Sequence, residues 1–311
     1  MKFSLVIPVA PERNAEILES IKKMDYPKKE FHVVVVRGKN PSENRNKGAE
    51  KAVGEIIGFL DDDAKVEKDF LKNIENFFNK YPSIDVVGGP QLTPKDDKSF
   101  AKISGYALCS RFGAAGTSNR YKKGELNLDA DESSITSANL FVRKHVMNKV
   151  SFDTNLFPGE DPKFIEDAKE AGFRVAYCPD FVVYHRRRPT ITGFTKQIFN
   201  YGKVRPKKES LSKTLKHPFF LIPSLFVIYL AFLIINSLFN PIITGGFIGV
   251  DKFNSNILFI PLLLYIALAI IFSFIDSVDN KDFKAVFVLP FIYLLIHLSY
   301  GIGMIRGYVK R

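Results

Sequence analysis

The most restrictive feature of this sequence is a set of apolar stretches in its last third. Each is about as long as a helix must be to cross a bilayer, and none contains Asp, Glu, Lys or Arg. The stretches cover residues 219–239, 257–275 and 285–305. Long helices in a soluble core are the alternative, but three such stretches together favour membrane insertion. We therefore expect a transmembrane region of about three helices over residues 218–311.

Charge is concentrated directly before this region. Residues 1–185 carry 28 basic and 28 acidic side chains, whereas residues 186–216 carry 10 basic side chains and 1 acidic one. A basic segment in this place predicts contact with anionic lipid headgroups or with a pyrophosphate. Because the excess is confined to one segment, a nucleic-acid partner is not expected.

The same charges predict which face of the membrane the chain occupies. Basic residues before the first span favour a multi-pass protein of the cell membrane whose preceding part is cytoplasmic. Two cysteines and an N-terminus without a signal peptide agree with this expectation. However, Arg306, Lys310 and Arg311 also favour the cytoplasm, whereas three crossings would place them outside. Either one stretch is re-entrant or interfacial, or residues 242–250 contribute to a further span.

The first half of the chain alternates between short apolar strands and helices. This order predicts an α/β fold with a mostly parallel central sheet and right-handed crossovers. Ligands bind such sheets at the carboxyl ends of the strands, where Pro8, Gly38 and Asp61 would lie. We expect strands over residues 2–9, 31–36, 56–60, 85–89, 135–143, 174–178 and 181–185. We expect helices from residue 17, over 42–53 with Ser42 as N-cap, over 66–81, near 100–112, and from the 156–162 turn to Gly172.

Asp61, Asp62 and Asp63 follow the 56–60 strand directly. Three consecutive carboxylates repel one another unless a cation is close. Mg²⁺ or Mn²⁺ together with a phosphate-bearing ligand would relieve this repulsion, because hard oxygen ligands suit both ions. The alternative is a solvated turn that caps the 66–81 helix.

Six short motifs occur in one order along the chain. They are Val6-Ile7-Pro8, residues 44–48 with Gly54-Glu55, residues 59–63, Gly159-Glu160-Asp161, Val183-Tyr184-His185, and residues 197–202. In this order the sequence resembles the family-two inverting glycosyltransferases of the membrane-anchored kind. The resemblance implies a GT-A-like nucleotide-sugar-binding catalytic domain over residues 1–185. It also implies that a basic juxtamembrane segment, residues 186–217, completes the active site.

The resemblance further implies roles for individual residues. Asp61, Asp63 and His185 would bind Mg²⁺ or Mn²⁺, although His185 at a strand end could instead bond a backbone carbonyl. The expected donor-binding residues are Pro8, Glu12, Arg45, Lys47, Asp61 and Asp62. The expected contacts to the acceptor or diphosphate are Asn139, Arg186, Gln197 and Tyr201.

Asp161 matches the catalytic base that inversion requires, with Glu160 beside it. The alternative is structural, because Asp followed by Pro162 is also a good helix N-cap. Two departures from the family pattern stand out. Asn200 and Tyr201 replace an Arg-Trp pair, and residues 37–40 lack the acids that commonly contact the donor's base or ribose. Glu12 is the substitute candidate for that contact.

The expected function is therefore transfer of a sugar from a nucleotide-sugar donor to a lipid-linked or glycan acceptor. Membrane lipids would be further partners, in polysaccharide or glycolipid biosynthesis, and three spans favour single addition over polymerisation. A nucleotidyltransferase on a similar core is one alternative, because it would use the same carboxylates for metal. A non-catalytic membrane scaffold is the other.

Overall fold

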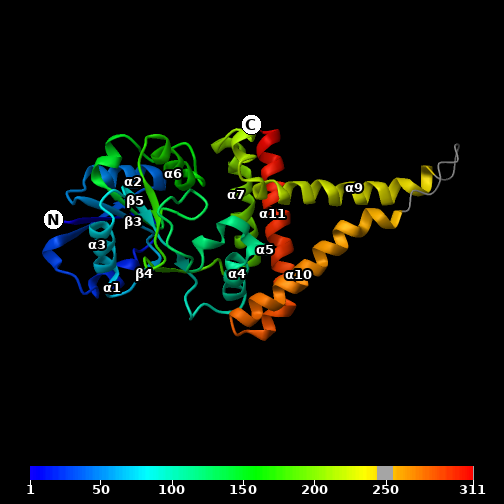
Figure 1. The fold of residues 1–311 in the computed structure, drawn as a ribbon, viewed down its shortest axis with the longest axis horizontal. Coiled ribbons are helices and arrows are strands. Elements are labelled where there is room, and N and C mark those ends of the chain that lie inside the picture. The colour runs from blue at the N-terminus through cyan, green and yellow to red at the C-terminus, as the bar shows by residue number, and fades with distance from the viewer. Residues whose placement is uncertain (244–254, 311) are drawn as a thin grey trace. The chain divides into compact units, whose positions relative to one another are not determined.

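A computed structural model describes residues 1–243 and 255–310 of the chain (Figure 1). Most of the 242–250 segment, considered above as part of a further span, therefore lies outside the described residues. The chain divides into two compact units. One consists of residues 1–105 and 116–189, and the other of residues 106–115 and 190–311.

The N-terminal unit is built on a six-stranded sheet with the order β2-β1-β3-β7-β5-β8. Its strands are β1 Phe3–Val9, β2 Phe31–Arg37, β3 Ile56–Leu60, β5 Val86–Gly88, β7 Asn139–Arg143 and β8 Val175–Tyr177. β1 is parallel to β2 and β3, and β5 is parallel to β8, whereas β7 is antiparallel to both of its neighbours. The prediction of an α/β fold with a mostly parallel sheet is confirmed.

A second, three-stranded sheet has the order β4-β9-β6. Its strands are β4 Ala64–Val66, β6 Gln91–Leu92 and β9 Val183–His185. The expected 66–81 helix was wrong at its start, because Val66 is buried in β4 and pairs with Val183. The helix in question, α3, covers Phe70–Lys80. The antiparallel register sets Ala64 opposite His185, which brings β9 next to the acidic triplet.

The remaining helices of this unit are α1 Ile17–Lys22, α2 Pro41–Glu50 and α6 Glu160–Glu170. Asn40, not Ser42, caps α2: its side chain accepts hydrogen bonds from the backbone N–H groups of Ser42 and Glu43. Pro41 then occupies the first helical position, which its fixed φ favours. α4 Ser99–Cys109 crosses from this unit into the other. Short 3₁₀ turns cover Lys28–Glu30, Ala115–Arg120 and Lys144–Asn148.

The core lies on both faces of the central sheet. On one face the Phe141 ring makes edge contacts with the rings of Phe3, Phe70 and Phe181. Gly58 on β3 makes room for this ring, since a Cβ at Gly58 would lie 2.3 Å from it. On the other face Phe59, Phe152 and Phe164 pack together. β7 begins at Asn139 rather than at residue 135, because the N–H of Asn139 closes a turn onto the Thr136 carbonyl.

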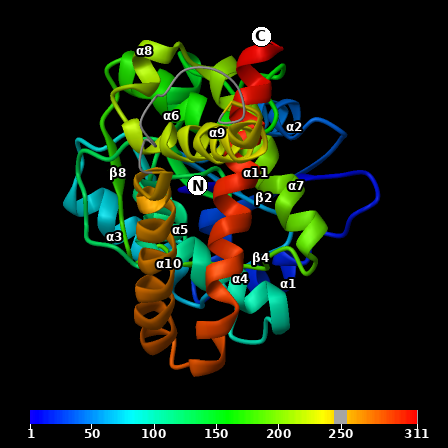
Figure 2. The ribbon, with the colours of Figure 1, turned by 90° about the vertical axis from the view of Figure 1, so that its right-hand side faces the viewer.

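The C-terminal unit is helical, and Figure 2 shows it from a second side. Its helices are α5 Arg111–Ala114, α7 Ile191–Lys208, α8 Leu211–Thr214, α9 Ile222–Ile243, α10 Ile260–Asp279 and α11 Leu289–Val309, with 3₁₀ turns at Pro218–Phe220, Ser255–Phe259 and Phe283–Phe287. Within the described residues, three helical segments are long and apolar enough to cross a membrane: Pro218–Leu238, Ile257–Asp279 and Leu289–Val309. They coincide closely with the predicted stretches.

α5 joins this unit through Phe112, which the sequence did not indicate. The Phe112 ring contacts the rings of Tyr265, Tyr293 and His297. Its carbonyl oxygen lies 2.9 Å from His297 Nε2, while His297 Nδ1 lies 2.9 Å from the Tyr265 hydroxyl. A carbonyl oxygen can only accept, so Nε2 carries the proton and the Tyr265 hydroxyl donates to Nδ1.

Candidate active site

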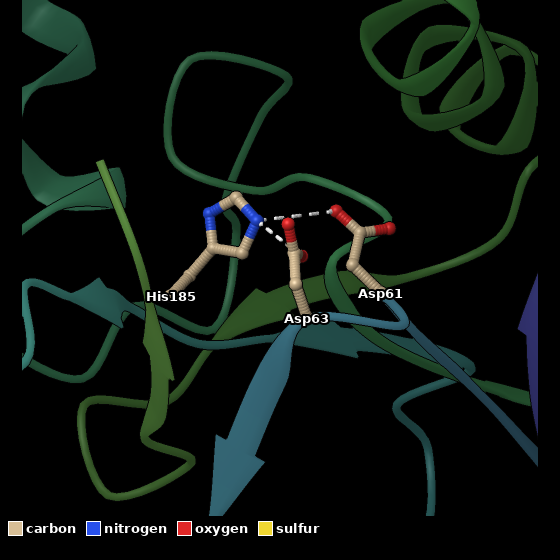
Figure 3. A group of neighbouring side chains, drawn as sticks. All are labelled: Asp61, Asp63 and His185. Carbon is tan, nitrogen blue, oxygen red and sulfur yellow. Dashed lines mark ion pairs between the residues drawn. The ribbon is translucent and has the colours of Figure 1, made fainter. Parts of the chain in front are cut away.

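Asp61, Asp63 and His185 gather at the carboxyl end of β3 (Figure 3). One ligand atom from each of the three lies within 4.8 Å of the others. His185 Nε2 is 2.8 Å from Asp63 Oδ1 and 3.9 Å from Asp61 Oδ2. The other ring nitrogen, Nδ1, is buried and has no hydrogen-bond partner among the described residues, backbone carbonyls included. Nε2 is therefore the ring atom that faces the carboxylates.

This donor set fits a divalent cation. Two carboxylates and one imidazole suit Mn²⁺, and the carboxylates suit Mg²⁺. Burial raises the pKa of Asp61. Burial also acts to raise the pKa of Asp63, but hydrogen bonds from His185 and Arg13 outweigh it and hold that pKa below its usual range. Asp63 is thus kept ionised, as a metal ligand must be.

Arg13 is a residue that sequence reasoning missed. It lies in the loop after β1, and its guanidinium is 2.5 Å from Asp63 Oδ2 and 3.2 Å from Asp62 Oδ1. Burial raises the pKa of Asp62 to about 6 in spite of this contact. Glu12, which the sequence suggested for donor binding, is exposed beside Arg13. The carboxyl ends of β1 and β3 are neighbours. A basic residue after β1 could therefore have been predicted to lie near the acids that follow β3.

Arg45 lies under the cluster and is only 5% exposed. From α2 it donates to Glu160 Oε1 at 2.9 Å and to Asp61 Oδ1 at 3.2 Å, and it approaches Asp161 Oδ1 at 3.9 Å. Burial alone would lower the pKa of Arg45, but these three carboxylates raise it. Burial and the Asp161 carboxylate raise the pKa of Glu160 to about 8. One guanidinium is thus shared by three carboxyl groups at this edge of the sheet.

Asp161 lies in the first turn of α6, but Gly159 is the N-cap. The alternative interpretation of Asp161 as an N-cap is therefore wrong. Its Oδ1 instead accepts a hydrogen bond from the Ser137 hydroxyl, a second contact that the sequence did not indicate. The Asp161 side chain is 22% exposed and that of Glu160 only 4%. Of the two acids, Asp161 is the one that an external hydroxyl can reach.

The remaining predicted site residues make other contacts within their own units. In the N-terminal unit, Pro8 is buried in β1, Lys47 pairs with Glu43, and the Asn139 amide donates to the Phe181 carbonyl. Arg186 forms ion pairs with Asp96 and Asp97. On α7, in the C-terminal unit, the Gln197 amide donates to the Tyr201 hydroxyl at 3.0 Å.

Comparison with known proteins gives this site a context. The family model described as Glycosyltransferase like family 2 matches residues 1–200. The chain belongs to this family. This family 2 glycosyltransferase is 24% identical to glycosyltransferase AglE of Haloferax volcanii over 64% of the chain and 71% of AglE. It is 22% identical to the dolichyl N-acetyl-alpha-D-glucosaminyl phosphate 3-beta-D-2,3-diacetamido-2,3-dideoxy-beta-D-glucuronosyltransferase of Methanococcus voltae, over 99% of the chain and 97% of that protein.

A solved structure supports the fold of this family 2 glycosyltransferase. The mannosyltransferase PcManGT from Pyrobaculum calidifontis, in complex with GDP-Man and Mn²⁺, matches with a TM-score of 0.61 and 15% identity. The match covers 100% of this chain and 88% of PcManGT. The fold is GT-A-like, and the chain is an enzyme.

We predict that Arg45→Gln costs about 3–5 kcal/mol of unfolding free energy, because it leaves Glu160 and Asp61 buried without a counter-ion. The double variant Arg45→Gln/Glu160→Gln should be more stable than Arg45→Gln alone, because the buried carboxylate is then removed together with its partner. Lys47→Gln is the matched control on the same helix, where the exposed pair with Glu43 contributes only about 0.3–0.5 kcal/mol. Urea unfolding followed by circular dichroism measures these three variants and Glu160→Gln alone, which completes the double-mutant cycle. Additive effects of the Arg45 and Glu160 substitutions would contradict the ion pair.

Proposed function

We propose that this family 2 glycosyltransferase moves a sugar from a nucleotide-sugar donor to a lipid-linked or glycan acceptor at the cytoplasmic face of the membrane. Transfer inverts the anomeric carbon and depends on Mg²⁺ or Mn²⁺. The observation that carries this proposal is the gathering of Asp61, Asp63 and His185 at the sheet edge, with Arg45 linking Asp61 to Asp161.

Asp61, Asp63 and His185 would hold the cation. When bound, a divalent cation neutralises the charge that develops on the leaving diphosphate. Two observations support this assignment. The ligand atoms are already close enough to share one ion, and the surplus of carboxylates around Arg45 favours a further positive charge. PcManGT, which shares the fold, was solved in complex with GDP-Man and Mn²⁺, and such a donor and ion would suit this cluster as well.

Asp161 would act as the base that removes the proton of the acceptor hydroxyl as that hydroxyl attacks. Ser137 holds Oδ1 by a hydrogen bond, which fixes the rotamer of the carboxylate and leaves Oδ2 for the incoming proton. A single displacement with such a base inverts the anomeric carbon. Glu160 is buried against Arg45, so its role is to hold that guanidinium rather than to meet substrate.

A lipid-linked acceptor fits two features of the chain. The C-terminal unit contains three apolar helical segments that could reach into a bilayer. The Methanococcus voltae relative, which matches over 99% of this chain, is named for action on a dolichyl-phosphate-linked sugar. Asn139, Arg186, Gln197 and Tyr201 remain the predicted contacts to the acceptor or diphosphate.

We predict that binding of a nucleoside diphosphate requires a divalent cation. Asp63→Asn should weaken Mn²⁺-dependent binding more than its matched neighbour Asp62→Asn, because the Asp62 side chain is outside the three-residue cluster. Calorimetry with UDP and GDP, in Mn²⁺ and then in chelator, measures both effects. Equal affinity with and without chelator would remove the metal assignment.

We predict that Asp161→Asn lowers sugar transfer by roughly 10²- to 10⁴-fold, the usual contribution of a positioned base. Nucleotide binding and the unfolding midpoint should stay near those of the unsubstituted protein, because Asn keeps the shape and can still bond Ser137. Transfer to a lipid-phosphate-linked sugar, measured with radiolabelled donor, is the readout. Asp167→Asn, in the same helix but paired with Lys163, is the control and should keep its activity. Near-normal transfer by Asp161→Asn would contradict its role as base.

A further inference from the structure

The three apolar helical segments of the C-terminal unit differ in how far the protein covers them. In Leu289–Val309, 44% of the apolar window is buried inside the protein, against 17% for Pro218–Leu238 and 11% for Ile257–Asp279. Large exposed apolar side chains are spread along α9 and α10, whereas on α11 they are limited to Phe291, Ile302 and Val309. Two of the segments therefore offer an apolar surface along their length, and α11 does not.

α11 is covered mainly because its backbone touches that of α7 (Figures 1 and 2). A Cβ on Gly303 would lie 2.1 Å from the Phe199 carbonyl oxygen, and one on Gly307 would lie 2.4 Å from the Lys203 carbonyl oxygen. From the other side, a Cβ on Gly202 would lie 2.1 Å from the Tyr300 carbonyl oxygen. Glycines on both helices thus permit direct backbone contact over two turns, and larger residues there would force the helices apart.

α7 is unsuited to the interior of a bilayer. Its 18 residues include Lys196, Lys203, Arg205, Lys207 and Lys208. Lys196 and Lys207 are exposed and stand near opposite ends of the helix. Charged side chains in hydrocarbon are costly, and no part of α7 is long enough to cross a bilayer without one. A helix bound along α7 by backbone contact must therefore remain with it outside the hydrocarbon core.

α9 and α10 meet α11 near their ends, whereas α7 packs along it. α9 leaves α11 where Gly301 touches the Pro223 carbonyl, and α10 returns toward the 3₁₀ turn Phe283–Phe287 that precedes α11 (Figure 1). α11 thus runs across the base of the α9–α10 hairpin. If the hairpin stands in a bilayer, a helix across its base lies along the surface.

We propose that, among the described helices, α9 and α10 alone cross the membrane, while α11 stays packed on α7 at the face from which α9 enters. The two crossings bring the chain back to that face. The cations at Arg306, Lys310 and Arg311 then lie on the same side as the basic residues before α9, as the positive-inside tendency requires. This topology goes beyond the proposed activity and does not depend on it.

Side-specific labelling in oriented membrane vesicles tests the proposal with the full-length protein. Lys216→Cys, just before α9, and Lys310→Cys, just after α11, are each made with Cys109 and Cys178 replaced by Ser. A membrane-impermeant maleimide should label both from the same face. A peptide tag inserted after Gly246, between α9 and α10, should meet its antibody only from the other face. Labelling of Lys310→Cys from the face opposite Lys216→Cys would overturn the proposal, as would a tag on the same face.

A second pair of variants keeps all native cysteines. Ile302 on α11 and Ile270 on α10 are both exposed, at 48% and 55%, and each lies within its apolar segment. Ile270→Lys should lower the amount of membrane-integrated protein roughly tenfold or more, because the ammonium would face lipid. Ile302→Lys should leave that amount within about twofold of the unsubstituted level, since its side chain can reach headgroups. Equal losses from the two substitutions would contradict a surface position for α11.

Discussion

The candidate active site is organised around one buried guanidinium. Arg45 joins the N-terminal part of the sheet to α6, because it bonds Asp61 at the end of β3 and Glu160 at the start of α6. A buried ion pair is stable only when its charges are matched, and here one cation serves three carboxylates. Burial, and to a lesser degree the neighbouring carboxylates, raise the pKa values of Asp61 and Glu160 in spite of Arg45. The same imbalance makes this edge of the sheet attractive to a further cation.

The small β4-β9-β6 sheet supplies the third proposed metal ligand, His185. β4 starts right after Asp63. Its antiparallel register with β9 sets His185 opposite Ala64 and so beside the Asp63 carboxylate. Acids from the first third of the chain thereby meet a histidine more than a hundred residues later. Asp161 and Ser137 complete the site from α6 and from the turn before β7.

Much of this arrangement could be predicted from the sequence. Strands such as β1 and β3 were evident, because each is a short, mostly apolar run that contains Val or Ile and is followed closely by Pro11 or Asp61. The motif order predicted the grouping of Asp61, Asp63 and His185 through resemblance. Contacts that depend on tertiary structure were not predicted. Arg13 and Ser137 reach their partners only through chain segments that the fold brings together. Val66 was assigned to a helix because its pairing with Val183 cannot be seen locally.

The apolar C-terminal helices show the same division between what the sequence predicts and what only the structure reveals. Length and lack of charge identified all three apolar segments. Length and composition could not show that α11 is largely covered by the protein. That cover comes from glycines on α11 and α7 that bring the two backbones into contact. Apolar composition shows that a helix is able to cross a membrane, whereas its packing against other helices determines whether its surface is free to contact lipid.

The central claim is that Asp61, Asp63 and His185 together hold the cation of the donor complex. Electron paramagnetic resonance of Mn²⁺ tests this most directly, with the protein and a nucleoside diphosphate both present. The account predicts a ¹⁴N modulation from a histidine nitrogen bound to Mn²⁺, and its loss in His185→Gln. A spectrum that matches the protein-free Mn²⁺–nucleotide complex, in the unsubstituted protein, would contradict the account.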